Sequence, residues 1–70
     1  MKKREFDKTS HNILSVKYRR AWFYDYKIYE VIGCNSSERL FKLKDEKMYG
    51  GVTWVRCESV IVFEIKTTIK

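Results

Sequence analysis

The sequence predicts a small, mainly β domain in which five short strands close into a strongly bent barrel. Apolar and polar residues alternate in several short stretches, which is typical of half-buried strands. Clusters of Gly, Asn, Ser and Asp separate these stretches, and the chain contains no proline. A chain of 70 residues has room for one small core, and closure of the sheet removes strand edges that would promote aggregation.

The first twelve residues are predicted as a polar N-terminal arm, and residues 13–70 as the barrel domain. Phe6 is the only large apolar residue of the arm. We therefore expect residues 1–12 to be mobile, or to be attached to the barrel through Phe6 alone.

Residues 13–20 fit two kinds of secondary structure. Apolar residues recur at helical spacing, and Ser10 is available as an N-cap. The alternation of Leu14, Val16 and Tyr18 with polar residues also fits a half-buried strand. We favour the strand, because β-branched and aromatic residues dominate and the rest of the chain has a β pattern.

Four further strands are predicted, over residues 27–33, 39–44, 52–57 and 60–66. In the second of these, strict alternation directs Phe41 and Leu43 toward the core. In the last strand, Ile61, Phe63 and Ile65 share one face, which we assign to the core. Trp54 is also assigned to the core, with the wall of a binding groove as the alternative.

The connections between the strands are predicted from turn-forming residues. Residues 33–37 form a turn cluster of Gly, Cys, Asn and Ser, and Gly50 and Gly51 close a hairpin loop. Asp45 and Glu46 lie in that loop among lysines, and we interpret them as solvated charges.

The apolar and turn pattern resembles that of small bacteriophage and bacterial proteins with a Src-homology-3-like barrel. The resemblance is carried by residues 27–33 (KIYEVIG), 40–43 (LFKL), 51–55 (GVTWV) and 60–65 (VIVFEI). Two features depart from that pattern: residues 56–59 lack the usual proline, and residues 1–25 are not covered. The resemblance implies a five-stranded Src-homology-3-like barrel and a binding role, often in phage–host interactions, without identifying a partner.

Composition limits the environment and the partners. The net charge of +6 favours a polyanion or an acidic protein as partner. Cys34 and Cys57 do not form a metal-binding pair, and we expect free thiols in a reducing cytoplasm rather than a disulfide. No apolar run is long enough for a transmembrane helix, which predicts a cytoplasmic protein without membrane contact, in the host cytoplasm if the gene is phage-encoded.

The candidate partner-binding residues lie in residues 17–29, where aromatic and basic side chains alternate. They are Lys17, Tyr18, Arg19, Arg20, Trp22, Tyr24, Tyr26 and Lys27. Tyr, Trp and Arg dominate protein interfaces, and rings with cations also bind single-stranded nucleic acid. If the stretch were a strand, its cations would fall on both faces, which favours a protein partner over nucleic acid. Trp22 and Phe23 have a core position as an equal alternative.

The sequence gives no sign of catalysis. We predict no catalytic residues, no metal ligands and no cofactor, because His11 is the only histidine and no phosphate-binding Gly-rich loop is present. A remote alternative is a small metal-free ribonuclease toxin, which would use His11, Arg19, Arg20 and Tyr24. A homodimer or an added strand is also possible, because Val60, Val62 and Ile28 are predicted on the face opposite the core.

Overall fold

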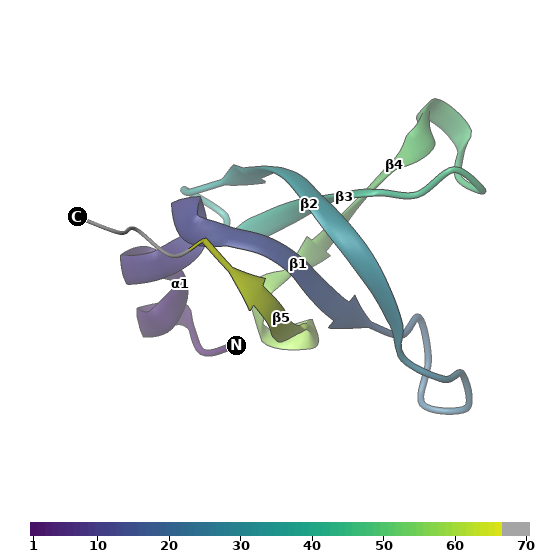
Figure 1. Ribbon diagram of the computed structural model, residues 1–70, viewed down its shortest axis with the longest axis horizontal. Coiled ribbons are helices and arrows are strands. Elements are labelled where there is room, and N and C mark those ends of the chain that lie inside the picture. Colours follow the sequence, from purple (N-terminus) through teal and green to yellow (C-terminus); the bar gives the residue numbers. More distant parts are fainter. Residues whose placement is uncertain (67–70) are drawn as a thin grey trace.

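The prediction of a mainly β protein is confirmed by the computed structural model, which describes residues 1–66. Five antiparallel strands form one sheet in the order β4-β3-β2-β1-β5 (Figure 1). The strands are β1 (Ile13–Tyr18), β2 (Lys27–Asn35), β3 (Leu40–Lys44), β4 (Val52–Arg56) and β5 (Ile61–Ile65). β4 and β5 lie at the two ends of this order, and among residues 1–66 no pairing between them closes the sheet. Residues 67–70 of the predicted domain lie outside the described residues.

The ambiguous segment at residues 13–20 is a strand, as predicted, but it is shorter. β1 ends at Tyr18 and lies between β2 and β5, with Val16 opposite Tyr29 on one side and Val62 on the other. Val16 is fully buried. Pairing on both sides explains why the β pattern prevails over the helical spacing: side-chain packing in a central strand outweighs local propensity.

β2 is longer than predicted, and the turn that follows it is displaced. The strand continues through Gly33 to Asn35, and its register with β3 shifts between Val31 and Gly33. Such a bulge bends a strand, which agrees with the strong curvature of β2 in Figure 1. The turn itself is closed by the side chain of Asn35, whose Oδ1 accepts hydrogen bonds from Ser37 Oγ at 2.8 Å and the Glu38 N–H at 3.1 Å.

The segment predicted as a polar arm is folded. Lys3–Thr9 forms helix α1, and Ser10–Asn12 forms a 3-10 turn, η1, that leads into β1. Phe6 is only 1% exposed, and its ring packs edge-on against Phe41, with ring centres 5.0 Å apart. Asp7 accepts two hydrogen bonds from Arg39, at 2.9 and 3.0 Å, and this guanidinium lowers the pKa of the Asp7 carboxyl. The attachment at Phe6 therefore makes α1 part of the core.

The inward positions of β3 are confirmed, whereas those of β5 are reversed. Phe41 and Leu43 are fully buried. In β5, however, Ile61, Phe63 and Ile65 are about half exposed, at 51, 47 and 52%. The reversal follows from the short 3-10 turn η3 (Cys57–Ser59), which leads into β5. The residue after this turn, Val60, is buried, and because side chains alternate along the chain, positions 60 and 62 face inward. Because side chains alternate with period two, a change of phase by one residue exchanges the two faces.

Two further predictions about the faces of β4 and β5 are wrong. Trp54 is 48% exposed and lies on the outer face of β4, where the ammonium of Lys42 is 5.8 Å from the centre of its ring. Val60 and Val62 face the core rather than the opposite face on which they were predicted, whereas Ile28 is exposed as expected.

The two thiols differ in accessibility, which leads to a testable prediction. In the folded protein, iodoacetamide is expected to alkylate Cys34 before Cys57 at neutral pH. Burial raises the pKa of the Cys57 thiol, and this residue is 1% exposed, whereas Cys34 is only partly buried. The reactive form is the thiolate, so a raised pKa and burial both slow the reaction. Mass spectrometry after timed quenching measures both rates, and equal rates in the native protein would contradict the packing of Cys57.

Candidate partner-binding site

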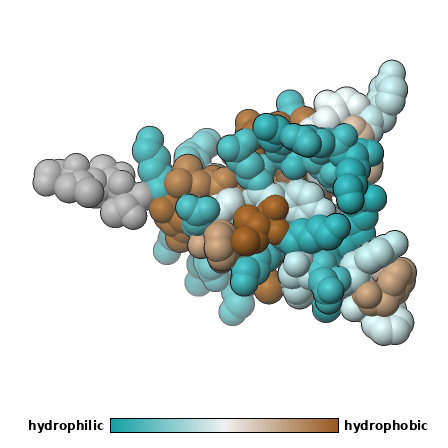
Figure 2. Space-filling view, turned by 45° about the vertical axis from the view of Figure 1, so that its right-hand side comes forward, coloured by the Kyte–Doolittle hydropathy of each residue, from teal (hydrophilic) through white to brown (hydrophobic). Residues whose placement is uncertain are grey.

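Residues 19–26 form an exposed loop between β1 and β2, which we call the aromatic loop. Its tip carries three consecutive rings, Trp22, Phe23 and Tyr24, which are 82, 64 and 54% exposed. We call these three side chains the aromatic knob. In Figure 2 a pale and light-brown cluster projects at the lower right, where Figure 1 places this loop. The core position considered for Trp22 and Phe23 is therefore wrong: β1 ends before them, and the loop carries them away from the sheet.

The rings of the aromatic knob pack against one another. Trp22 and Phe23 meet edge to face, with centres 5.6 Å apart and planes at 89°. Phe23 and Tyr24 are 4.7 Å apart at 39°. The three rings therefore form one continuous apolar projection rather than three separate stacking surfaces.

Arg19 holds the aromatic loop in shape. Its Nη1 donates a hydrogen bond to the carbonyl of Trp22 at 3.3 Å, and its guanidinium lies 4.6 Å from the centre of the Tyr26 ring. The N–H of Tyr24 donates to the carbonyl of Ala21 at 3.0 Å, which closes a turn at the tip. Contacts of this kind reduce the conformational freedom that the loop would lose on binding.

Arg20 joins the aromatic loop to the connection between β3 and β4. Its Nη2 donates to Oδ2 of Asp45 at 2.9 Å, and this hydrogen bond raises the pKa of the Arg20 guanidinium. Oδ1 of Asp45 accepts the N–H of Lys47 at 3.2 Å, and the Asp45 N–H donates to the carbonyl of Gly51 at 2.9 Å. Asp45 is 6% exposed, so its interpretation as a solvated charge is wrong. One buried carboxylate thus fixes two loops to each other.

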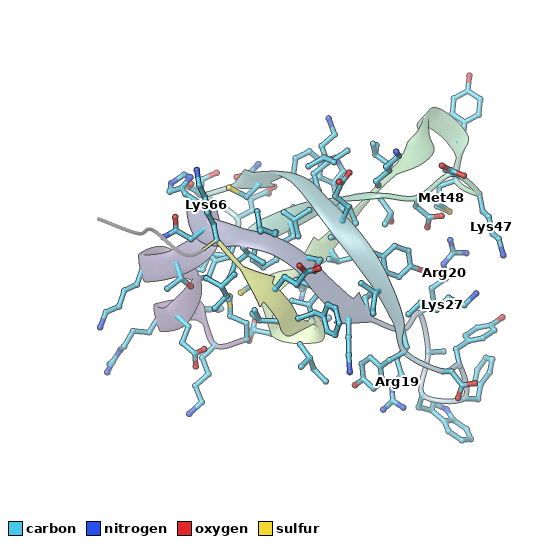
Figure 3. The ribbon with its side chains drawn as sticks, viewed as in Figure 1. Arg19, Arg20, Lys27, Lys47, Met48 and Lys66 are labelled. Carbon is cyan, nitrogen blue, oxygen red and sulfur yellow. The ribbon has the colours of Figure 1, made fainter. Side chains whose placement is uncertain are left out.

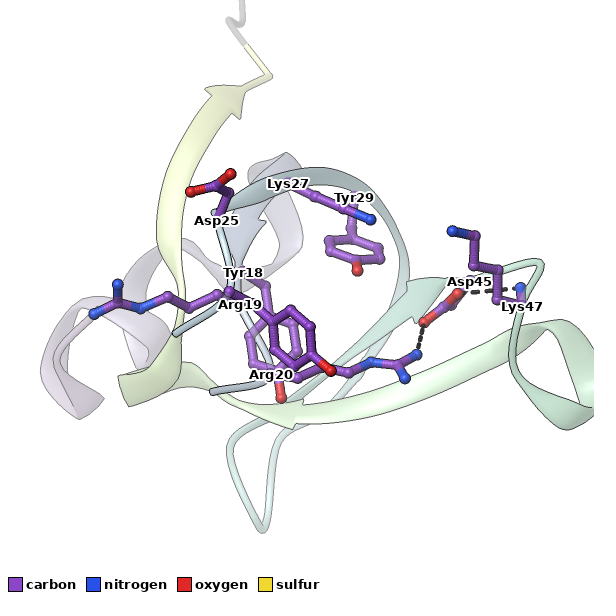
Figure 4. A pocket seen from close by; sticks show the side chains of 9 residues that line it. Tyr18, Arg19, Arg20, Asp25, Lys27, Tyr29, Asp45 and Lys47 are labelled. Atoms are coloured by element: carbon purple, nitrogen blue, oxygen red, sulfur yellow. Dashed lines mark hydrogen bonds and ion pairs between the residues drawn. The ribbon is translucent and has the colours of Figure 1, made fainter. Parts of the chain in front are cut away.

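A pocket of about 210 Å³ lies between these two loops (Figure 4). Tyr18 and Tyr29 meet edge to face in its wall, with ring centres 6.0 Å apart. Figure 3 shows Arg19, Arg20, Lys27 and Lys47 at the same end of the molecule. The complete lining is Tyr18, Arg19, Arg20, Tyr24, Asp25, Lys27, Tyr29, Asp45 and Lys47.

The structure brings together most of the candidate residues that the sequence singled out. Five of them line the pocket: Tyr18, Arg19, Arg20, Tyr24 and Lys27. Trp22 and Tyr26 belong to the aromatic loop outside the pocket. Lys17 lies apart from them, with its ammonium 5.3 Å from the centre of the Phe63 ring on β5. The expected distribution of cations over two strand faces does not occur, because β1 ends at Tyr18 and most of the stretch is loop.

Four residues of the pocket were not predicted. Tyr29 and Asp25 lie within or beside the aromatic-basic stretch, so its composition alone could have included them. Asp45 and Lys47 come from the connection between β3 and β4, where Asp45 lies 25 residues after Arg20, and nothing in the local sequence links them to Arg20. Their place depends on the sheet order, which puts the two loops at one end.

His11 is not brought to the residues of the ribonuclease alternative. It lies in η1, before β1, whereas Arg19 and Arg20 follow the far end of that strand. A strand of six residues spans about 20 Å, which separates His11 from the pocket. Among residues 1–66, no three His, Cys, Asp or Glu side chains lie together as a metal site, and no helix could span a membrane.

Comparisons with known proteins give no family. No family model matches the chain, and no curated protein or solved structure is significantly similar to it.

Proposed function

We propose that this protein is a non-enzymatic binding module that recognises another protein through the aromatic knob. The observation that carries the proposal is the exposure of three consecutive large rings, with Trp22 82% exposed. An exposed cluster of this kind gains nothing for the stability of its own fold, because its apolar surface stays in water. Burial of these rings against a partner would gain the hydrophobic free energy that the exposed rings do not contribute to folding. Aromatic residues dominate such contacts.

The chemistry of the site suggests the form of the partner's surface. A continuous projection of rings fits an apolar groove. Beside it, Lys27 and Lys47 line the pocket, and among residues 1–66 neither side chain forms a salt bridge. We therefore propose a partner that presents an apolar groove next to a carboxylate.

The proposal extends to the fold family and the biological setting. We propose that the five strands form a Src-homology-3-like barrel, on the resemblance carried by residues 27–33, 40–43, 51–55 and 60–65. On that resemblance, we propose a phage-encoded modulator or inhibitor of a host protein. The cytoplasm is its proposed location, where Cys34 and Cys57 would remain reduced.

Single-stranded nucleic acid is the second candidate partner. It is favoured by one observation: Arg20, Lys27 and Lys47 line one pocket together with three tyrosines. Against it, Asp45 already neutralises Arg20, Asp25 adds a second negative charge to the pocket, and the knob rings are packed together. We rank this reading below protein binding.

Salt dependence separates the two partners. Binding to nucleic acid would weaken by orders of magnitude between ~50 and ~200 mM salt if six or more phosphates were contacted. A protein contact through the aromatic knob is expected to change far less, because its main contribution is burial of apolar surface. The test is affinity purification from host lysate at both salt concentrations, with and without nuclease. If the captured partner is lost after nuclease treatment or at the higher salt concentration, nucleic acid replaces protein as the proposed partner.

A further inference from the structure

The pocket between the aromatic loop and the β3–β4 connection is rich in hydrogen-bond donors. Four side chains of its lining form neither a hydrogen bond nor a salt bridge among residues 1–66: Tyr18, Lys27, Tyr29 and Lys47. The guanidinium of Arg20 has further N–H donors beside the one that it uses in its ion pair. Two ammonium groups, two phenol hydroxyls and part of a guanidinium are therefore left for a ligand.

The charges of the lining do not cancel. It contains four cations and two carboxylates, which leaves a net charge of +2: Arg19, Arg20, Lys27 and Lys47 against Asp25 and Asp45. In Figure 4 the side chains of Lys27 and Lys47 point toward one another, and the Tyr29 hydroxyl is directed toward Arg20. The pocket therefore favours an anion, and an anion with two negative charges balances its lining.

Asp45 fixes the position of the Arg20 guanidinium. Both oxygens of this buried carboxylate are engaged, Oδ2 by Arg20 and Oδ1 by the N–H of Lys47. The hydrogen bond to Asp45 raises the pKa of Arg20, and the phenols of Tyr29 and Tyr18 raise it further because they lie close to the guanidinium. A guanidinium that is already held in place loses less conformational freedom when it binds an oxyanion.

We propose that this pocket is a binding site for a phosphate monoester. Such a group carries a charge of about −1.5 to −2 at pH 7 and three strong acceptor oxygens, so it matches both the charge and the donors of the lining. A carboxylate or a phosphodiester carries a single negative charge and would leave the pocket positive. The inference rests on the proposed function, in which the partner brings an oxyanion to this pocket, and it names the oxyanion that binds more tightly.

The size of the pocket restricts the enclosed part of the ligand to the phosphate and its nearest atoms. The volume of about 210 Å³ is below the range of ~300–1,000 Å³ for sites that enclose a whole small molecule. Tyr24 belongs both to the lining and to the aromatic knob, so the pocket adjoins the knob. A phosphorylated side chain of the partner and a nucleoside monophosphate are the two sources of such a monoester.

The test is a titration of the ¹⁵N-labelled full chain with phenyl phosphate at about 50 mM salt, followed by NMR. Saturable shifts are expected at residues 27, 29 and 45–47, with a Kd of about 1 mM or lower. Benzoate and methyl phenyl phosphate keep the ring but carry one negative charge, and each is expected to bind at least about fivefold more weakly. Absence of saturation by about 10 mM phenyl phosphate, or equal binding of the three compounds, would overturn the proposal.

A second series of ligands identifies the source of the phosphate. The N-acetyl amides of phosphoserine and phosphotyrosine represent a phosphorylated side chain, and adenosine 5′-monophosphate represents a nucleotide. All three are expected to shift the signals of the same residues as phenyl phosphate, and the tightest of them indicates the source. If none of the three shifted these signals, the pocket would not be a phosphate monoester site.

The variant Lys27→Gln/Lys47→Gln removes both ammonium groups and is expected to weaken the binding of phenyl phosphate at least about tenfold. Both lysines are exposed and their side chains form no salt bridge among residues 1–66, so the fold is retained. The matched control is Lys8→Gln/Lys44→Gln, which changes the net charge equally at two exposed lysines outside the pocket. It is expected to bind within about twofold of wild type. Equal losses from the two double variants would show attraction by the overall charge alone and contradict a pocket site.

Trp22→Ala separates this inference from the proposed function. Trp22 does not line the pocket, so its variant is expected to bind phenyl phosphate as wild type does, although its binding to the partner is weakened. Loss of phenyl phosphate binding in Trp22→Ala would place the phosphate on the aromatic knob and refute the pocket site. If wild type bound its partner through the knob but bound no phosphate monoester, this inference would fail and the proposed function would stand.

Discussion

Phe6→Ala is expected to lower the free energy of unfolding by about 3–5 kcal/mol, the range found for large-to-small changes of buried aromatic residues. Phe6 is 1% exposed and is the only buried residue of α1, so its loss leaves a cavity beside Phe41 and releases the helix. A domain of this length has a total stability of roughly 5 kcal/mol, so the variant should be largely unfolded at 37 °C. Urea denaturation followed by circular dichroism measures the change.

Lys8→Ala provides the control for Phe6→Ala. Lys8 is exposed in the last turn of the same helix, so its replacement is expected to change the stability by less than about 0.5 kcal/mol. If Phe6→Ala were as mild as Lys8→Ala, residues 1–12 would be the detached arm that the sequence predicts, and the packing of α1 would be wrong.

Trp22→Ala is expected to weaken partner binding by at least about 30-fold while leaving stability unchanged within about 0.5 kcal/mol. Both parts follow from its exposure of 82%: the ring is available to a partner and contributes little to the core. Titration calorimetry with the partner purified from host lysate measures the binding. Urea denaturation measures the stability, and a buried Trp22 would instead cost about 3–5 kcal/mol.

Tyr49→Ala is the matched control for Trp22→Ala. Tyr49 is 103% exposed but lies in η2 (Tyr49–Gly51), between β3 and β4, and does not line the pocket. Its replacement is expected to leave binding within about twofold, as for most residues outside a hot spot. Equal losses from the two variants would show that exposed rings contribute without specificity, and the aromatic knob would lose its assigned role.

The strand pattern could be predicted from the sequence because it is a local signal. Alternation located all five strands to within two residues at each end, and it placed Phe41 and Leu43 in the core. Composition located the aromatic-basic stretch, and five of its eight candidate residues line the pocket.

The errors concern properties that local sequence does not contain. The phase of β5 depends on how η3 turns the chain, and an alternating strand with apolar residues on both faces fits either phase. The role of Phe6 depends on a contact with Phe41, far away in the chain. The burial of Asp45 depends on Arg20, which the sheet order brings to it. In each case a tertiary contact decides between local alternatives.

The central claim is that the aromatic loop is the surface that meets the partner. The most direct measurement is a titration of the ¹⁵N-labelled protein with the purified partner, following the backbone amide signals by NMR. The largest shift changes are expected at residues 20–27 and 45–48, around the aromatic knob and the pocket, with small changes along β4 and β5. Shift changes confined to the β4 and β5 edges, with the signals of residues 20–27 unaffected, would contradict the claim.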